Sequence, residues 1–276
     1  MSMNVNNTGG RNLAVTGQVG KWPSVFVWDT ESATQVARLK LGKGARAVAA
    51  CAISPDGTHI ATADKHNDHN VMIWAVGGGT GSPVYGEKGG PDPIFDITFT
   101  KQPGAYSVWS VGLKHMTFWD PAQGKKKKGL FGQNPRTNFS CVCAGDQGLA
   151  YSGASNSGIY VWAGNTCKNV AFLHGKGFVG AITWQAGKVY SGGKDGQVLI
   201  IDAASMQVEN AIQFGVPVRA VDVMGTSVLV GLRSGSIVVC DMAAGAMNTI
   251  MESHNSGEIW GLDTDGTYVY TSADDN

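Results

Sequence analysis

Short hydrophobic runs recur along the chain at a regular interval, separated by polar and Gly-rich segments. Each run consists mainly of β-branched and aromatic residues and ends in an aromatic residue that is often followed by Asp. Such runs predict half-buried β-strands, and no convincing helical pattern is present. The copies are Ser24–Asp29, Val71–Trp74, Met116–Asp120 and Ile159–Trp162, with two weaker ones at Val198–Asp202 and Ile237–Asp241.

The interval between these runs indicates the fold. Their final positions are Trp28, Trp74, Trp119, Trp162, Ile201 and Cys240, which are spaced by 46, 45, 43, 39 and 39 residues. A period of about 40–45 residues with a Trp-Asp ending is typical of WD40 repeats, each of which forms one four-stranded blade of a β-propeller. We therefore predict an all-β WD40 propeller from a ring of seven blades.

The residues around each Trp-ending run fit the other strands of a blade. An apolar segment such as Phe178–Trp184 precedes a shorter segment with small residues, such as Tyr190–Gly193. A more polar segment, such as Gln207–Gln213, follows the Trp-ending run. These segments are expected to be the first, second and fourth strands of a blade, counted outward from the central channel.

The repeat also predicts the domain organisation. Residues 1–11 are polar and Asn-rich, which favours an N-terminal segment outside the propeller, and residues 12–276 form the propeller. The chain then starts at a second strand, Asn12–Thr16, and ends at another, Tyr268–Ser272. We expect five complete blades, two partial blades and an incomplete ring. Strands from a longer polypeptide, or from another molecule, would close it.

Composition narrows the function classes. The 276 residues include 39 Gly, and 21 Lys plus Arg balance 21 Asp plus Glu, so bulk charge does not indicate a nucleic-acid binder. The longest apolar run, residues 47–53, is far shorter than the ~20 residues that span a bilayer. Five irregularly spaced cysteines are expected to be reduced thiols. Nucleotide-binding loops are absent, and we expect no cofactor, nucleic-acid partner or membrane partner.

Several polar residues stand at places where WD40 repeats bury a hydrogen-bond network. His174 precedes a first strand and Asp195 follows a second strand, the spacing at which both join a Ser or Thr and the Trp. Ile201 replaces the Trp in this repeat, and His254 with Asp274 or Asp275 is a second candidate copy. We predict a structural role for His174, Asp195, His254 and the four tryptophans Trp28, Trp74, Trp119 and Trp162.

Other reactive side chains favour packing over chemistry. His66 and His69 lie in a turn between strands and lack a third ligand at zinc-like spacing, so a polar hairpin loop is the preferred interpretation and no metal is expected. Cys141 and Cys143 share one face of a strand and are expected to pack. A hydrolase with its site in the channel would use acids on first strands, where Asp96 and Asp222 are the candidates. Two scattered acids do not make such a site, and we predict a protein that is not an enzyme.

One basic run and four aromatic residues are candidates for contact with partners. The run is Lys125, Lys126, Lys127 and Lys128. It is suited to an anionic partner, but lysines on an outer strand also prevent edge-to-edge aggregation, and both interpretations remain open. The aromatic candidates, each of which fits strand packing as well, are Trp22, Trp109, Trp184 and Trp260.

Several segments resemble the echinoderm microtubule-associated-protein-like (EMAP-like) family of WD40 proteins, in that family's order and from about Leu13 to Asp275. The resemblance covers most of the family's first propeller. The segments that carry it are Val15–Gly20, His66–Trp74, Lys128–Gly132, Ser191–Gly196 and Gly257–Leu262.

The resemblance implies a non-enzymatic scaffold that is associated with microtubules. Its expected partners are tubulin or other microtubule-bound proteins, and its expected location is the cytoplasm and cytoskeleton, including the cilium or axoneme. The alternative is a general WD40 adaptor that binds other proteins through one ring face without binding tubulin.

Overall fold

The computed structural model describes residues 3–6, 12–77, 82–102, 104, 106–252 and 259–273, and these residues are almost entirely β-strand. One short 3-10 helix, η2 (Pro121–Gln123), lies among them. The strands form antiparallel sheets in which sequence neighbours pair, as the repeat predicts. The predicted all-β propeller class is confirmed.

Six sheets have four strands each, in the order inner to outer. The first three are β1 (Met3–Asn6), β2 (Leu13–Gly17), β3 (Ser24–Asp29), β4 (Thr34–Lys40); β5 (Val48–Ile53), β6 (His59–Asp64), β7 (Val71–Ala75), β8 (Tyr85–Glu87); and β9 (Ile94–Phe99), β10 (Val108–Gly112), β11 (His115–Asp120), β12 (Lys125–Lys128).

The next three are β13 (Phe139–Ala144), β14 (Leu149–Ala154), β15 (Gly158–Ala163), β16 (Thr166–Phe172); β17 (Val179–Gln185), β18 (Lys188–Gly193), β19 (Gln197–Asp202), β20 (Val208–Gln213); and β21 (Val218–Met224), β22 (Ser227–Leu232), β23 (Ile237–Asp241), β24 (Ala246–Met251). A seventh sheet has two described strands, β25 (Ile259–Thr264) and β26 (Val269–Ala273).

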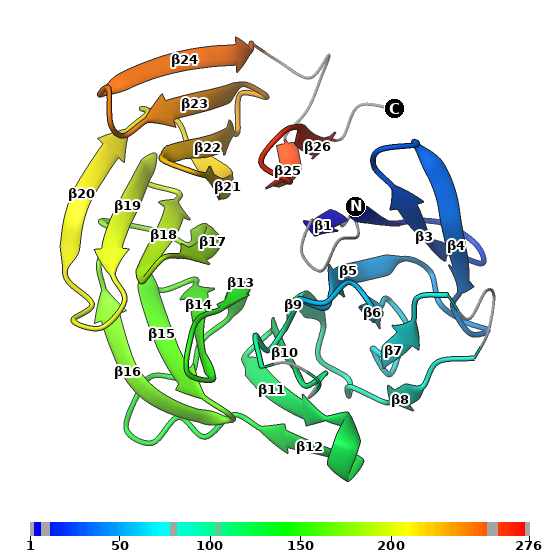
Figure 1. Cartoon of the computed structure of the whole chain (residues 1–276). Helices are drawn as coiled ribbons and strands as arrows, with labels where there is room; N and C mark the ends of the chain where they lie inside the picture. Colours follow the sequence, from blue (N-terminus) through cyan, green and yellow to red (C-terminus); the bar gives the residue numbers. More distant parts are fainter. Residues whose placement is uncertain are drawn as a thin grey trace.

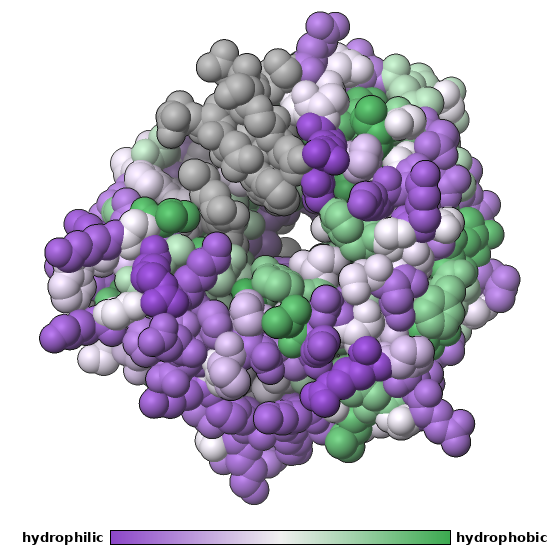
Figure 2. All heavy atoms as spheres, turned by 180° about the vertical axis from the view of Figure 1, so that it is seen from behind, coloured by the Kyte–Doolittle hydropathy of each residue, from purple (hydrophilic) through white to green (hydrophobic). Residues whose placement is uncertain are grey.

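The seven sheets are the blades of a ring, with the first strand of each blade at the centre (Figure 1). Residues of all seven first strands line a central channel of about 760 Å³. The channel opens on the face seen in Figure 2, where hydrophilic side chains cover much of the surface. Successive strands of a blade run in opposite directions, so its loops lie alternately on two sides of the ring. The loops that join second to third strands, and the loops that join one blade to the next, lie on the same side, which we call the upper face. The loops that join first to second strands and third to fourth strands lie on the other side, the lower face.

The N-terminal segment corrects one prediction. Residues 1–11 were expected to lie outside the propeller and to leave the first blade without its inner strand, but Met3–Asn6 form β1 and pair with Leu13–Thr16. The blade is therefore four-stranded, and the described chain has six four-stranded blades instead of five. The short Met-Asn-Val-Asn stretch has the alternation of a half-buried strand: Val5 is buried, and the Asn4 side chain is hydrogen-bonded within the channel.

The hydrophobic core lies between neighbouring blades. Each main cluster combines residues of two adjacent sheets: one joins Val15 and Val27 of the first blade to Ile53 and Trp74 of the second. Four further clusters repeat this arrangement around the ring, and Ile237 packs against Leu262 at the boundary with the seventh blade. Burial between blades fixes how the blades stack and therefore where their loops lie.

Small residues at the end of second strands allow blades to approach closely. A Cβ atom added at Gly17 would lie 2.5 Å from the Val48 Cβ, and one added at Gly192 would lie 2.3 Å from the Val218 Cγ1. Both valines begin the first strand of the next blade and are buried. Glycine is required here for space between sheets, which explains the small residues that the sequence shows in these strands.

A β-bulge recurs in the first strand of the second to seventh blades. The register with the second strand shifts near its start, for example between Val48 and Ala50 and between Val218 and Ala220. A bulge inserts one residue that has no partner across the ladder and re-aims its side chain. Here that residue lines the channel: it is Ala49, Phe95, Ser140, Gly180 or Arg219 in five successive blades.

Candidate interaction surfaces

The four repeat tryptophans each donate an indole hydrogen bond to a hydroxyl on the second strand of their own blade. The acceptors are Thr16 for Trp28, Thr62 for Trp74, Ser110 for Trp119 and Ser152 for Trp162, at 2.8–3.0 Å between Nε1 and Oγ. Trp74, Trp119 and Trp162 are buried, and Trp28 is half-exposed. A buried indole N–H without an acceptor costs about 1–3 kcal/mol, so these pairs support the predicted structural role.

His174 performs the equivalent task in the fifth blade, where Ile201 replaces the tryptophan. Its Nε2 lies 2.9 Å from the Ser191 hydroxyl and its Nδ1 lies 3.1 Å from the Asp195 carboxylate. Asp195 also accepts backbone N–H groups from Gly175 and Gln197. Burial lowers the pKa of His174, and the Asp195 charge opposes this shift without reversing it.

The arrangement resembles a Ser-His-Asp catalytic triad only in its residue types. The His174 ring is buried and the Ser191 hydroxyl is fully buried, so neither has room for a substrate. The second predicted copy, His254 with Asp274 or Asp275, lies outside the described residues.

The basic run forms β12, the outer strand of the third blade, paired with β11. Lys125, Lys127 and Lys128 are exposed, and Lys126 is half-buried. Alternation along a strand places Lys126 on the side opposite Lys125 and Lys127. The run therefore consists of three solvent-exposed lysines and one lysine, Lys126, that faces the second blade.

Lys126 connects the third blade to the second. Its Nζ lies 2.9 Å from the Glu87 carboxylate on β8, donates to the Lys88 carbonyl, and lies 5.6 Å from the centre of the Trp119 ring. This lysine has a structural role at the boundary between blades. The exposed lysines remain available to a partner, and the edge-protection interpretation applies to them as well.

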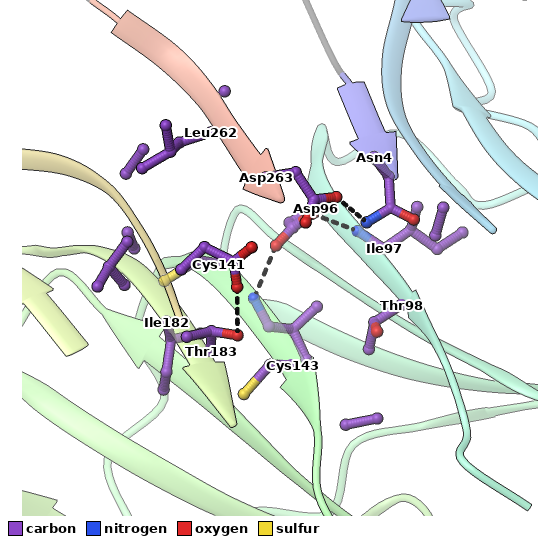
Figure 3. A pocket seen from close by; sticks show the side chains of 18 of the residues that line it. Asn4, Asp96, Ile97, Thr98, Cys141, Cys143, Ile182, Thr183, Leu262 and Asp263 are labelled. Carbon is purple, nitrogen blue, oxygen red and sulfur yellow. Dashed lines mark hydrogen bonds between the residues drawn. The ribbon is translucent and has the colours of Figure 1, made fainter. Parts of the chain in front are cut away.

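A chain of hydrogen bonds runs along the channel wall where the first and last described blades meet, and Figure 3 shows part of it. Thr183 donates to Asp222, and the Thr264 backbone N–H donates to the same carboxylate at 3.0 Å. The Asn4 side-chain amide and the Val5 backbone N–H both donate to Asp263. The Ile53 N–H then donates to the Asn4 carbonyl oxygen at 2.9 Å. The chain links four first strands, β17, β21, β1 and β5, to β25.

These channel acids have raised pKa values. Burial, followed by the negative charge of Asp222, raises the pKa of Asp263 well above its usual range. Burial also raises the pKa of Asp222, with which Asp263 interacts directly. Asp96 lies elsewhere in the channel, where burial raises its pKa to about 7 although the Val142 and Ile97 N–H groups stabilise the charge.

Only part of this cluster was found from the sequence. Asp96 and Asp222 were candidates, but the structure separates them and groups Asp222 with Asp263 and Asn4. Asp263 stands at the same place in its repeat as Asp222: each comes two residues after the pairing with the second strand resumes beyond the bulge, at Gly261 and Ala220. Alignment of the two repeats could have found it. Asn4 was missed because β1 was not predicted.

The remaining candidates are packed or hydrogen-bonded. Burial raises the pKa of Cys141 to about 12 and that of Cys143 further still, which disfavours thiolate chemistry. Asp64 organises the 65–70 loop by accepting from the His66 and Asn70 backbone N–H groups. Within the described part of the chain, no three His, Cys, Asp or Glu residues are arranged to hold a metal ion.

The aromatic candidates differ in exposure. Trp109 is buried and donates to the Gly164 carbonyl, so it packs. Trp184 is half-buried under Lys101, whose Nζ lies 3.7 Å from the ring centre. Trp22 is 57% exposed in an upper-face loop and remains a candidate contact residue, and the Trp260 side chain lies outside the described residues.

The described chain contains no helix with the length and apolarity needed to cross a bilayer.

The blades, the Trp–hydroxyl pairs and the central channel define a WD40-repeat β-propeller. The WD domain, G-beta repeat family matches residues 35–75, which include the end of the first blade and three strands of the second.

The chain is 44% identical over 272 residues to a ciliary WD repeat-containing protein, ctxp80, of Euplotoides octocarinatus, covering 96% of this chain and 37% of that protein. It is 29% identical over 255 residues to EMAP-like protein 2 of Mus musculus, covering 88% of the chain and 38% of that protein. It is 27% identical over 265 residues to EMAP-like protein 1 of Rattus norvegicus, covering 91% and 32%.

The resemblance to EMAP-like WD40 proteins that the sequence indicated is thereby confirmed over most of the chain. The chain spans 32–38% of the length of these curated relatives.

Proposed function

We propose that this chain is a non-enzymatic scaffold that associates with microtubules, in the cytoplasmic cytoskeleton and specifically in cilia or axonemes. The observation that carries the proposal is the 44% identity to a ciliary WD repeat-containing protein over 96% of the chain. Similarity to echinoderm microtubule-associated protein-like proteins over 88–91% of the chain supports the same class. Tubulin or microtubule-bound proteins are the proposed partners, and neither a membrane nor a nucleic acid is among them.

The exposed lysines of β12 support an electrostatic contribution. Lys125, Lys127 and Lys128 project from the outer strand of a rigid blade, where an anionic polypeptide can reach them. Exposed charge pairs contribute only about 0.2–1 kcal/mol each. A microtubule presents the same site many times, so several weak contacts can add up to stable association.

The domain assignment belongs to the same proposal. We propose that residues 12–276, together with β1, form one propeller.

Co-sedimentation with stabilised microtubules tests the proposal. The chain would be sedimented over a salt series with intact and tail-cleaved microtubules. The Lys125→Ala/Lys127→Ala/Lys128→Ala variant would be compared with Lys40→Ala/Lys168→Ala/Lys188→Ala, which removes the same charge elsewhere. We expect the chain to pellet, and the first variant to lose more binding than the second. A chain that stays in the supernatant at low salt contradicts the proposal and favours the general WD40 adaptor.

A further inference from the structure

The net charge of zero conceals a separation of charge between the two faces of the ring. In each of the six four-stranded blades, the upper-face loops contain at least one exposed Lys or Arg. On the lower face the third strands end in the repeat aspartates Asp29, Asp120, Asp202 and Asp241. Among the described lower-face loop residues, Lys101 is the one Lys or Arg. Over the described residues, the ring therefore has a basic face and an acidic face.

The repeat accounts for the acidic face. Each of these aspartates accepts backbone N–H groups of the turn that follows, such as Ser32 N–H on Asp29 and Ser205 N–H on Asp202. These carboxylates are needed to form the turns. The basic residues of the upper face have no such part in forming turns, because most of them are exposed lysines at the tips of loops.

The cations of the upper face are continuous over the second and third blades and the loops that flank them. Arg46, Lys65, Lys88, Lys114 and Arg136 define this basic arc, and all five are exposed. Their loops are joined directly to one another. The Arg46 N–H donates to the Lys65 carbonyl at 3.2 Å, and the Arg136 Nε donates to the Lys114 carbonyl at 2.8 Å.

The arc also reaches β12. Lys126 donates to the Lys88 carbonyl, so the exposed lysines of β12 continue the basic surface down the outside of the third blade. Lys88 is partly neutralised by Asp68, 2.9 Å away, and Asp92 is an exposed acid in the same region. Five arc cations against these two acids leave a net charge of +3, and the other four arc cations have no ion pair of their own among the salt bridges of the described residues.

We infer that the basic arc binds a carboxylate-rich, extended segment of a protein partner. This inference rests on the proposed function and names the surface through which it acts. Charge complementarity selects an anionic ligand, and the arrangement of cations along an arc fits an extended chain. The arc loops 41–47, 65–70, 88–93 and 113–114 contain no Phe, Tyr or Trp, and their two aromatic rings, His66 and His69, are half-buried. Phe131, in the loop of Arg136, packs against Trp162, so few rings are open for base stacking. The acidic lower face also disfavours a polyanion that wraps around the ring.

The test is direct binding of a labelled oligo-glutamate peptide to the full chain, measured by fluorescence anisotropy over a salt series. A single-stranded oligonucleotide of the same charge would be measured in parallel. The Lys65→Ala/Lys114→Ala variant removes two arc cations, and Lys168→Ala/Lys188→Ala removes the same charge from other blades. Lys65, Lys114 and Lys168 are exposed, whereas Lys188 is half-buried and ion-paired with Glu209. Thermal unfolding would verify that both variants fold.

We expect the arc variant to bind oligo-glutamate about 2- to 30-fold more weakly, and the control to bind as the parent does. Equal weakening in both variants would overturn the inference, because the attraction would then be a property of total charge. Tighter binding of the oligonucleotide than of the peptide would also overturn it, in favour of a nucleic-acid partner.

The same variants separate this inference from the proposed function. If oligo-glutamate binds through the arc but the chain does not pellet with microtubules, the proposed function fails and the acidic-segment site stands. If the chain pellets and the arc variant pellets equally well, the proposed function stands and the arc is not its binding surface.

Discussion

The Asn4 side chain on β1 donates a hydrogen bond to the Asp263 carboxylate on β25, 3.2 Å away, and so joins residues 259 positions apart. The Val5 N–H donates to the same carboxylate, and Asp222 on β21 interacts with it from the other side. Among the described residues, the clusters of buried hydrophobic side chains join the other pairs of neighbouring blades, and none joins the first blade to the seventh. Polar side chains in the channel therefore contribute much of the connection between the first and last described blades.

The raised pKa of Asp263 makes stability depend on pH. A group with a raised pKa in the folded state binds its proton more tightly there, so its contribution is complete below about pH 4 and is lost as pH rises through the folded pKa. We expect Asp263→Asn to remove part of this decline, so that the variant gains stability relative to the parent as pH increases from 4 to 8. Urea unfolding at several pH values measures the difference.

Asp146→Asn is the matched control, because Asp146 is an exposed lower-face carboxylate outside the chain of hydrogen bonds. A parallel pH dependence in the parent and in Asp263→Asn would show that the Asp222–Asp263 pair does not titrate on unfolding.

His174 gives folding stability the opposite pH dependence, with stability lost as the pH falls. Its pKa is lowered by burial, so the folded state holds the ring neutral while the unfolded state takes up a proton below about pH 6.5. Stability is complete above that pH and is lost as the pH falls. His59 and His115 have pKa values lowered by burial as well and add to the same slope.

We expect His174→Gln to be less stable than the parent at pH 7.5 and to show a shallower loss between pH 6.5 and 5. An unchanged slope would mean that the His174 ring protonates without disturbing Ser191 and Asp195.

The Trp162–Ser152 pair should behave as a unit. Trp162→Phe removes the indole donor and leaves the buried Ser152 hydroxyl without its 2.8 Å partner. We expect a loss of about 1–3 kcal/mol in the free energy of unfolding, of which a second change, Ser152→Ala, restores part. Trp28→Phe, at a half-exposed site, should cost less. Additive losses in the Trp162/Ser152 double-mutant cycle would argue against the coupling.

Close approach between blades predicts a steric effect at Gly192. Alanine there places a Cβ 2.3 Å from the Val218 Cγ1, so the buried Val218 side chain or its strand must shift. We expect Gly192→Ala to lower the free energy of unfolding by about 1–3 kcal/mol. Gly42→Ala is the control, since its Cβ would meet nothing within 4 Å. Chemical denaturation of both variants distinguishes crowding from a general effect of replacing glycine.

Lys126 and Lys127 are adjacent but should respond to different assays. Lys126→Ala removes the ion pair with Glu87 and should cost less than about 1 kcal/mol of stability, because both groups are partly solvated. Lys127→Ala should leave stability unchanged and weaken binding to an anionic partner. Thermal unfolding and microtubule co-sedimentation of the two variants measure these effects. Loss of binding in Lys126→Ala alone would reverse the roles given to the two residues.

The sequence was sufficient for the fold because the Trp-ending strands repeat with a nearly constant period. It was insufficient for β1, since two asparagines in a four-residue strand are typical of a loop, and the channel hydrogen bonds that accommodate Asn4 are visible only in the structure. The grouping of Asp222 with Asp263 depends on the closeness of β21 and β25, the first strands of neighbouring blades. The basic arc was hidden for a similar reason: Arg46 and Arg136 are distant in sequence, and a balanced total charge says nothing about where each sign is located.

The recurring bulge in the first strands has a consequence for how such a ring diversifies. Ala49, Phe95, Ser140, Gly180 and Arg219 occupy equivalent sites, yet they span a methyl group, an aromatic ring, a hydroxyl, no side chain at all and a guanidinium. Because the inserted residue has no cross-strand partner, its chemistry can change while the ladder of hydrogen bonds stays the same. The channel lining can thus acquire new ligand preferences by single substitutions at most of these sites, whereas a Cβ at Gly180 would lie 2.7 Å from the Val218 carbonyl oxygen and would require the next blade to shift.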